Sequence, residues 1–223
     1  SITDNSCMTV PDEVIAVKGE SVVLPCRFTL PNKGYSGEVE VTWRKDTFYT
    51  GAVVFQWSYN INAKTVTLTG CKTAENEESR YQLVGNLKEN DVSLQIEDVI
   101  FEDKNIYFCH VELTQQSHKM YETQTGTNLR VLAPPRILNL SVTVNSSLGY
   151  RILQCIVEGE PLPNITWIGP GKAELHKESN NIIVTPFPEE HQMMSEIYNV
   201  TQDGIYTCRA VTNCGGDEEN IHV

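Results

Sequence analysis

The residues of this 223-residue chain best suited to chemistry are its seven cysteines and five histidines. Seven cysteines favour an oxidising compartment, where thiols pair as disulfides. The histidines are scattered, and His110 with His118 would supply only two of the four ligands of a tetrahedral zinc. There is no GxSxG, HExxH, Gly-rich phosphate loop or Cys-x-x-Cys motif. We therefore expect no enzyme, no cofactor and no metal site.

The first cysteine pair has the spacing of an immunoglobulin sandwich. Cys26 and Cys109 are separated by 83 residues, with Trp43 between them and Tyr107 two residues before the second cysteine. In this fold a buried strand-C Trp packs on the disulfide between the two sheets, and a tyrosine corner precedes the second Cys. The spacing also leaves room for the extra C′ and C″ strands of a variable-type domain.

The same pattern occurs a second time. Cys155 and Cys208 are separated by 53 residues, with Trp167 between them and Tyr206 two residues before the second cysteine. The shorter loop predicts a smaller sandwich without the extra strands. We therefore expect an all-β protein of two tandem immunoglobulin-like sandwiches: a V-set domain at residues 1–132 and a smaller C2- or I-like domain at 133–223. The boundary is placed at Ala133-Pro134-Pro135, because prolines favour an extended link.

Several shorter segments fit this frame. Arg80 opens an expected D strand, and Asp103 lies in the expected E–F turn, so the two are expected to form a salt bridge at the bottom of the domain. Val92–Ile96 alternates as a half-buried strand should. Residues 106–112 form the expected F strand, with Cys109 pointing inward. Because successive strand residues face opposite ways, His110 is expected on the open front sheet, where such domains can hold a ligand.

Charge excludes some partners. Residues 1–132 hold 12 Lys and Arg against 18 Asp and Glu, and residues 133–223 hold 5 against 11, for a total of −12. Without a basic stripe, nucleic acid is not an expected partner. No hydrophobic run approaches the ~20 residues that span a bilayer, and no signal peptide precedes Ser1. We expect the extracellular portion of a single-pass type I cell-surface protein; a naturally secreted protein is the alternative.

Between Val10 and about Trp167 the chain resembles the Siglecs, the sialic-acid-binding immunoglobulin-like lectins. The segments that carry the resemblance include Val23-Leu24-Pro25-Cys26, Val84-Gly85-Asn86, Tyr107-Phe108-Cys109, Tyr121-Glu122, Ala133-Pro134-Pro135-Arg136-Ile137 and Glu158-Gly159-Glu160-Pro161. The resemblance implies a cell-surface immune or adhesion receptor that recognises ligand on the front sheet of its V-set domain.

In that family an F-strand arginine holds the sialic acid carboxylate, and a G-strand aromatic packs on the sugar. Here the arginine position is His110, Tyr121 takes the aromatic position, and Lys119 is a nearby cation. A guanidinium offers two parallel donors and a permanent charge, whereas a neutral imidazole offers one donor, and free imidazole has a pKa near ~6.5. Sialoglycan binding is therefore expected to be weakened or lost at neutral pH, and residual affinity to rise on acidification.

Alternatives remain open from the sequence. The protein is a functional lectin that uses His110 and Tyr121, a receptor that binds protein through the same sheet, or a spacer whose interactions lie elsewhere. His110 and Tyr121 also fit plain strand residues without a role. Trp57 is either a core aromatic or an exposed anchor of a protein interface.

Four Asn-x-Ser/Thr sequons lie in the second domain, at Asn139, Asn145, Asn164 and Asn199. Four in so short a stretch predict a glycosylated second domain beneath a barer recognition domain.

Three cysteines, Cys7, Cys71 and Cys214, remain outside the two patterns. A Cys71–Cys214 bridge between the domains is expected from their places at facing ends, although the family resemblance implies a C′-strand partner for Cys71, and that position is Trp57. This scheme leaves Cys7 available for a disulfide-linked homodimer. Non-reducing gels should then show a dimer that Cys7→Ser abolishes. A monomer on the same gel in which no cysteine reacts with a thiol reagent would contradict the scheme.

Overall fold

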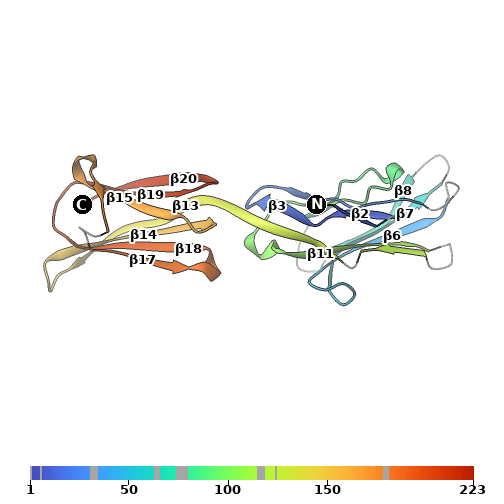
Figure 1. Ribbon diagram of the computed structural model, residues 1–223, viewed down its shortest axis with the longest axis horizontal. Coiled ribbons are helices and arrows are strands. Elements are labelled where there is room, and N and C mark those ends of the chain that lie inside the picture. Colours follow the sequence, from blue (N-terminus) through green and yellow to red (C-terminus); the bar gives the residue numbers. More distant parts are fainter. Residues whose placement is uncertain are drawn as a thin grey trace. The chain divides into compact units, whose positions relative to one another are not determined.

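The computed structural model describes residues 2–5, 7–30, 35–62, 66–73, 80–114, 119–123, 125–177 and 181–223. The chain divides into two compact units, Ser1–Val131 and Leu132–Val223, and each is described by itself (Figure 1). Both units are built from β-strands and short 3₁₀ turns, which confirms the all-β prediction. The division falls next to the expected boundary after residue 132.

The first unit holds the strands up to the start of β13. They are β1 (Ile2–Asn5), β2 (Met8–Pro11), β3 (Glu13–Val17), β4 (Val22–Leu24), β5 (Arg27–Phe28), β6 (Glu38–Lys45), β7 (Ala52–Ile61), β8 (Val66–Thr73), β9 (Tyr81–Leu83), β10 (Leu94–Ile96), β11 (Asn105–Leu113), β12 (Lys119–Glu122) and β13 (Thr127–Asn145), with 3₁₀ turns η1 (Leu87–Glu89) and η2 (Phe101–Asp103).

One sheet of this unit runs in the order β8–β7–β6–β11, with β12 and the first residues of β13 paired to β11. We call it the front sheet. The back of the sandwich is formed by β4–β10–β9 and by β1–β2–β5. β7 and β8 are the extra strands that the long Cys26–Cys109 loop predicted. They widen the front sheet beyond the strands that the disulfide frame alone requires.

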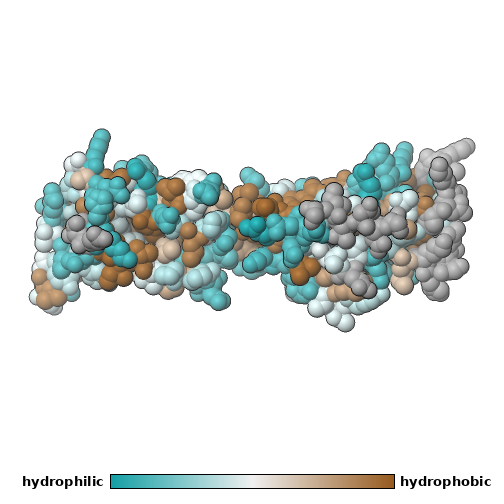
Figure 2. Space-filling view, in the orientation of Figure 1, coloured by the Kyte–Doolittle hydropathy of each residue, from teal (hydrophilic) through white to brown (hydrophobic). Residues whose placement is uncertain are grey.

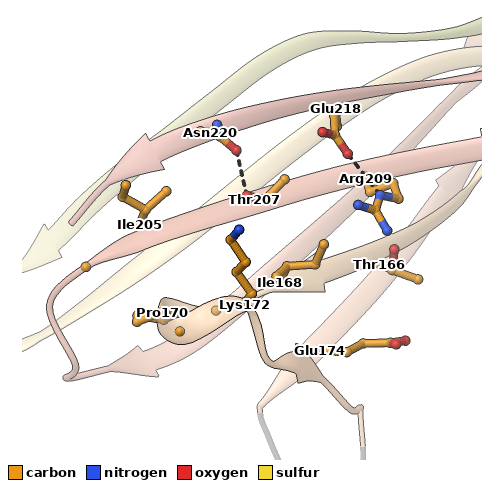
Figure 3. Close-up of a pocket in the computed structure, with 13 residues that line it drawn as sticks. Thr166, Ile168, Pro170, Lys172, Glu174, Ile205, Thr207, Arg209, Glu218 and Asn220 are labelled. Atoms are coloured by element: carbon orange, nitrogen blue, oxygen red, sulfur yellow. Dashed lines mark hydrogen bonds and ion pairs between the residues drawn. The ribbon is translucent and has the colours of Figure 1, made fainter.

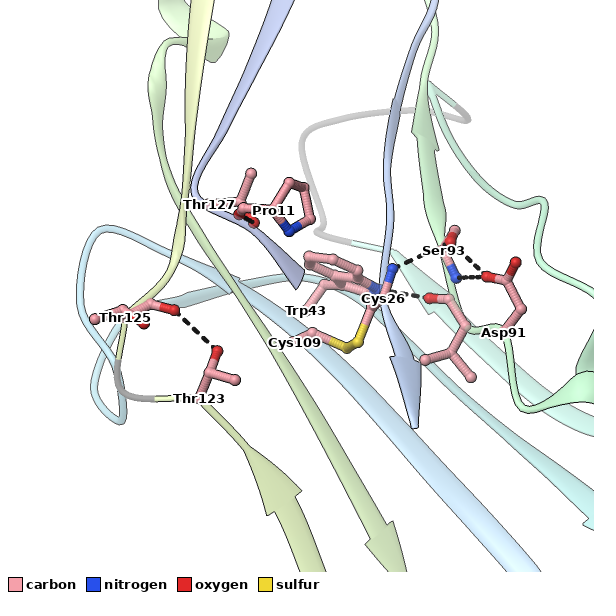
Figure 4. Close-up of a disulfide and its surroundings, with 10 residues drawn as sticks. Pro11, Cys26, Trp43, Asp91, Ser93, Cys109, Thr123, Thr125 and Thr127 are labelled. Carbon is pink, nitrogen blue, oxygen red and sulfur yellow. Dashed lines mark hydrogen bonds between the residues drawn. A yellow bond between two sulfur atoms is a disulfide. The ribbon is translucent and has the colours of Figure 1, made fainter. Parts of the chain in front are cut away.

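The Cys26–Cys109 disulfide joins the two layers at the centre of the core (Figure 4). Trp43 on β6 is fully buried against it, and its indole Nε1 donates to the backbone oxygen of Val92 at 3.1 Å. The predicted tyrosine corner is present, because the Tyr107 hydroxyl donates to the Asp103 carbonyl at 2.6 Å. The buried polar atoms of this frame are therefore hydrogen-bonded, as burial in an apolar core requires.

Trp57 on β7 is also buried, which decides the alternative left open by the sequence in favour of a core aromatic. Its ring packs on Phe55 with a centroid distance of 4.9 Å. In the backbone register Trp57 lies opposite Cys71, which belongs to strand β8. Among the described residues the Trp57 indole Nε1 has no hydrogen-bond partner.

The second unit repeats the frame at smaller size. Its strands after β13 are β14 (Tyr150–Glu160), β15 (Asn164–Ile168), β16 (Glu174–Leu175), β17 (Ile182–Phe187), β18 (Gln192–Val200), β19 (Ile205–Thr212) and β20 (Gly215–His222), with 3₁₀ turns η3 (Pro170–Lys172) and η4 (Pro188–Glu190).

These strands form two sheets around a second core. One sheet runs β17–β18–β14–β13, and the other runs β16–β15–β19–β20. The Cys155–Cys208 disulfide closes the core, and the buried Trp167 indole donates to the Ser195 hydroxyl at 2.9 Å. The Tyr206 hydroxyl donates to the Gln202 carbonyl at 2.9 Å, so both predicted tyrosine corners are confirmed.

The described part of the face shown in Figure 2 is a mosaic in which hydrophobic residues interrupt a hydrophilic background. Single exposed apolar side chains are ordinary on soluble domains. In the described part of the chain, no helix is long and apolar enough to cross a bilayer.

The predicted salt bridge at the bottom of the first unit is confirmed. The Arg80 guanidinium donates to both oxygens of Asp103, at 2.8 and 2.9 Å. Asp103 is buried, and it also accepts from the Ile100 amide at 2.9 Å. A bidentate pair with a buried carboxylate is one of the stronger ionic interactions in proteins.

Replacing Asp103 with Ala should lower the free energy of unfolding by about 3 kcal/mol, because it removes two charge-assisted hydrogen bonds of a largely buried ion pair. Urea denaturation followed by circular dichroism measures the change. The matched control is Glu13→Ala, which removes the partner of Arg130 in a half-exposed pair at 3.3 Å and should cost less than about 1 kcal/mol. Equal effects of the two substitutions would contradict this account.

Candidate ligand-binding site on the front sheet

His110 lies at the middle of β11 and faces away from the core, as the sequence predicted. Its neighbours on the strand, Cys109 and Val111, are buried, whereas the His110 side chain is 23% exposed. In the register His110 lies opposite Thr42 on β6 and Glu122 on β12. The inward direction of Cys109, fixed by its disulfide, sets the outward direction of the next residue.

A carboxylate binds the His110 ring. His110 Nδ1 and Glu122 Oε2 are 2.8 Å apart, and the Glu122 side chain is 22% exposed. The hydroxyl of Tyr49 donates to the other carboxylate oxygen, Oε1, at 2.6 Å. Glu122 thus joins a strand residue to the loop after β6. Because Nδ1 is occupied by Glu122, Nε2 is the ring nitrogen that a ligand can use.

These residues line a small cavity of about 230 Å³. Aromatic rings form part of the wall: Phe48 packs on Tyr49 at 4.4 Å and on Phe108 at 5.9 Å between centroids. Met120 is 50% exposed at the rim. The volume is below the roughly 300–1,000 Å³ of sites for drug-sized ligands, so the cavity suits one sugar ring or one protein side chain.

Arg44 also lines this cavity and brings a permanent positive charge that was not predicted from the sequence. It lies on β6 opposite Phe108, and its guanidinium donates to the Gly51 carbonyl at 3.3 Å. The signal was available, because Arg44 follows the inward-facing Trp43 and must therefore face outward. Glu122 was also missed as a site residue, although it stands next to Tyr121 in the segment that resembles the Siglecs.

Thr42, His110 and Glu122 form a row of polar residues across neighbouring strands, and this polar row continues onto β7. The Gln56 side-chain amide on β7 donates to Thr42 Oγ1 at 3.1 Å and to Glu40 Oε1 at 3.0 Å. Gln56 is paired with Thr42, which is paired with His110. Four neighbouring strands therefore present a hydrogen-bonding surface around the cavity.

The structure does not place Tyr121 on the front face, where its expected contact with a sugar requires it. Tyr121 lies opposite the inward-facing Val111, is only 8% exposed, and packs on Phe28 at 5.6 Å between ring centroids. Burial raises the pKa of its phenol. Strand alternation then places its two neighbours, Met120 and Glu122, on the front face. A one-residue difference in register exchanges the two faces of a strand, and it puts a carboxylate where an aromatic ring was expected.

Lys119 begins β12, and its backbone pairs with Leu113. Its side chain lies outside the described residues, so its expected contribution stays a prediction. The side chain of Cys71 lies outside them too. Cys214 is a partly buried thiol and Cys7 is exposed. Because the units are described separately, the Cys71–Cys214 bridge and the dimer through Cys7 stay predictions.

The sequon asparagines lie where a glycan could be attached. Asn139, Asn164 and Asn199 are exposed, and Asn145 is partly exposed, with its side-chain oxygen accepting from the Ser147 amide at 3.2 Å. Glycosylation at these four positions stays a prediction. In the described ranges no group of three or more His, Cys, Asp or Glu is arranged to hold a metal ion.

Comparison with known proteins agrees with this architecture. The model of the immunoglobulin V-set domain family matches residues 9–132, and that of the I-set domain matches residues 135–223. The V-set match covers more than half of the chain, so the chain belongs to the immunoglobulin V-set family. An I-set domain follows its V-set domain. Among solved structures it is similar to the amphioxus IgVJ-C2 molecule, with a TM-score of 0.53, 21% identity, and coverage of 94% of this chain and 98% of that one. That likeness shows the fold alone.

The relatives confirm the resemblance found in the sequence. The chain is 36% identical over 219 residues to sialic acid-binding Ig-like lectin 15 of Homo sapiens, which covers 97% of the chain and 63% of that protein. It is 27% identical over 216 residues to sialic acid-binding Ig-like lectin 12 of Pan troglodytes, covering 92% of the chain and 34% of that protein. The chain thus spans less than two thirds of the length of these relatives. Its two immunoglobulin domains are similar to those of the Siglecs.

The Tyr49–Glu122 contact makes a measurable prediction. The hydrogen bond to Glu122 raises the pKa of the Tyr49 phenol above its ordinary value of 10.0, because a negative acceptor favours the protonated hydroxyl. Glu122→Gln should therefore lower the pKa of Tyr49 toward 10.0. Alkaline titration of ¹³C-labelled tyrosines by NMR, assigned with Tyr49→Phe, measures this. Glu112→Gln removes another outward carboxylate, two residues from His110 on β11, and should leave the pKa of Tyr49 unchanged. An unchanged pKa of Tyr49 in Glu122→Gln would disprove the contact.

Proposed function

We propose that this chain is the extracellular recognition part of a cell-surface receptor, and that it binds its ligand on the front sheet of the first unit. We further propose that its affinity for sialylated glycans is weak at neutral pH. The observation that carries the proposal is the 2.8 Å contact between His110 and Glu122 in the position where the resembling lectins hold a sialic acid carboxylate. The names of both relatives describe sialic-acid binding, which supports the choice of ligand class.

The replacement of a guanidinium by His110 removes one parallel donor and a permanent charge. Each charge-assisted hydrogen bond contributes about 1.5–3 kcal/mol, which corresponds to a loss of about ten- to a few-hundredfold in affinity. Glu122 adds a second obstacle. A ligand carboxylate held roughly 6 Å from it would be repelled by about 3 kcal/mol at an effective dielectric constant of about 20. The pocket therefore opposes an anion in two ways.

Arg44 partly offsets that opposition. Its guanidinium lies in the wall of the same cavity, so the site keeps one permanent cation beside one carboxylate. The lectin alternative thus rests on Arg44 and His110, and Tyr121 has no part in it because it is buried. Residual sialoglycan binding through these two residues would be weak and sensitive to salt.

Exposed side chains at the rim support the alternative of a protein ligand. Tyr49 is 60% exposed and Met120 is 50% exposed, and both lie beside the cavity. Tyrosine and methionine are enriched in the contact surfaces of protein complexes. A protein-binding adhesion receptor without glycan activity is therefore the second candidate function.

The cell-surface location is part of the proposal. The two disulfides fit an oxidising compartment, and the four sequons fit the secretory route. We infer a single-pass type I arrangement in which the first unit carries the recognition surface.

A double-mutant cycle at positions 110 and 122 tests the proposal. The parent, His110→Arg, Glu122→Gln and the double variant are compared on sialylated glycans by surface plasmon resonance, with sialidase-treated glycans as the blank. His110→Arg alone should gain little, because Glu122 pairs with the new guanidinium. The double variant should bind about ten- to a few-hundredfold more tightly than the parent, since it restores the free bidentate cation.

Glu112→Gln combined with His110→Arg is the matched control, because it removes one front-sheet charge without freeing position 110. Its affinity for sialylated glycans should stay close to that of His110→Arg alone. A double variant that binds sialylated and sialidase-treated glycans equally weakly would overturn the weakened-lectin proposal. The protein-binding candidate would then be tested with Tyr49→Ala and Met120→Ala on receptor binding to cells treated with sialidase.

A further inference from the structure

The sheet β16–β15–β19–β20 of the second unit has an open face with a broad hollow of about 1110 Å³ (Figure 3). The face is built from outward residues, because Trp167 on β15 and Cys208 on β19 turn into the core. Thr166 and Ile168 alternate with Trp167 and line the hollow. This surface lies outside the front sheet and has no part in the proposed receptor function.

Apolar and hydrogen-bonding groups are mixed on this face. Ile205 and Val211 on β19 are each 46% exposed. Between them the Thr207 hydroxyl donates to Asn220 at 2.6 Å, and Arg209 donates to Glu218 at 3.0 Å, as the dashed lines in Figure 3 show. Such a surface suits a carbohydrate, which presents apolar ring faces beside hydroxyl and amide groups.

A sequon opens onto the same face. Asn164, the first residue of β15, is exposed and lies directly opposite Val211 on β19. Ile165 packs on the core, so alternation turns Asn164 and Thr166 outward together. Thr166, the third residue of the sequon, lies opposite Arg209 and lines the hollow. The attachment point is thus part of the surface.

The other sequons belong to different surfaces. Asn139 lies on β13 and Asn199 on β18, both in the opposite sheet of the second unit. Asn145 ends β13 at a turn. Asn199 also lines a separate pocket that includes Pro170 at the border of the hollow. None of these three asparagines lies on the sheet that bears the hollow, so Asn164 is the sequon on that sheet.

We propose that an N-linked glycan on Asn164 folds back over this face and covers Val211 and the hollow beyond it. An oligosaccharide is transferred from a lipid pyrophosphate donor to Asn164 Nδ2; the new bond joins sugar C1 to nitrogen, and the lipid pyrophosphate and a proton leave. A strand rises about 3.3 Å per residue, so Ile168 lies roughly 13 Å along β15 from the attachment point, and Ile205 lies roughly 20 Å along β19 from Val211. A few sugar rings cover that span. The first N-acetylglucosamine contacts Val211, and later rings extend toward Thr207 and Ile205.

The glycan then acts as a cover for exposed apolar side chains. Without it, Ile205 and Val211 meet water and other molecules on an open sheet. With it, sugar hydroxyls face the solvent. The second unit would therefore keep this face out of protein contacts while the first unit makes them.

The experiment uses methyl-labelled protein expressed in glycosylating cells and a soluble nitroxide that broadens exposed methyl signals. Removing the glycan by Asn164→Gln should increase the broadening of the Val211 and Ile205 methyl signals at least about twofold. Thr166→Ala, which breaks the sequon, should do the same, whereas Thr166→Ser, which keeps it, should behave as the parent. Ile183 and Val184, exposed on β17 of the opposite sheet, serve as internal controls that should not change.

Asn139→Gln, which removes a sequon on β13 of the opposite sheet, is the matched glycan control and should leave Val211 and Ile205 unaffected. Contact between the N-acetyl methyl of the first sugar and a Val211 methyl should appear as a nuclear Overhauser effect in the parent. The proposal is overturned if mass spectrometry finds Asn164 unoccupied. It is also overturned if Asn164 is occupied but its removal leaves the broadening of Val211 and Ile205 unchanged.

Discussion

The disulfide between Cys26 and Cys109 is the constraint on which the recognition surface depends. It fixes Cys109 in the core, and the two-residue alternation of β11 then turns His110 outward. The same alternation, carried across the hydrogen-bonded register, turns Thr42 and Glu122 to the same face. One covalent bond and one geometric rule thus assemble the polar row of the front sheet from three separate strands.

The chemical character of the site depends on the carboxylate of Glu122. A histidine alone would be an open imidazole on a sheet. One carboxylate oxygen of Glu122 contacts His110, and the other accepts a hydrogen bond from Tyr49. The cavity is therefore lined by a connected network of polar residues beside aromatic rings. Such a network is stable in the absence of ligand because its members satisfy one another. A ligand must therefore offer interactions at least as good as those it displaces, which favours a partner that contacts the rim and the walls together.

The sequence predicted the fold well because its signals are local and repeated. Each Cys…Trp…Tyr-x-Cys set specifies a disulfide, a buried indole and a corner, and all six contacts are present. Arg80 and Asp103 were also predicted correctly, since both are anchored to fixed points of the frame. His110 was placed correctly for the same reason, because it adjoins Cys109.

The remainder of the site was harder because β12 has no such anchor. In the sequence no cysteine or other anchored residue of β12 marks its register on β11. The resemblance to the Siglecs therefore placed Tyr121 one residue away from the outward position that Glu122 occupies. The outward direction of Arg44 could have been predicted, because it follows the inward-facing Trp43 on the same strand. The aromatic contacts of Phe48 depend on a loop conformation that strand periodicity does not describe.

The burial of every tryptophan has a spectroscopic consequence. Trp43 and Trp57 lie in the core of the first unit and Trp167 in the core of the second, all shielded from water. Intrinsic emission therefore reports the integrity of the two cores and not events on their surfaces. A variant with Trp167 replaced by Phe would leave tryptophans in the first unit only. Selective excitation of tryptophan would then follow the unfolding of the recognition domain without a signal from the second domain.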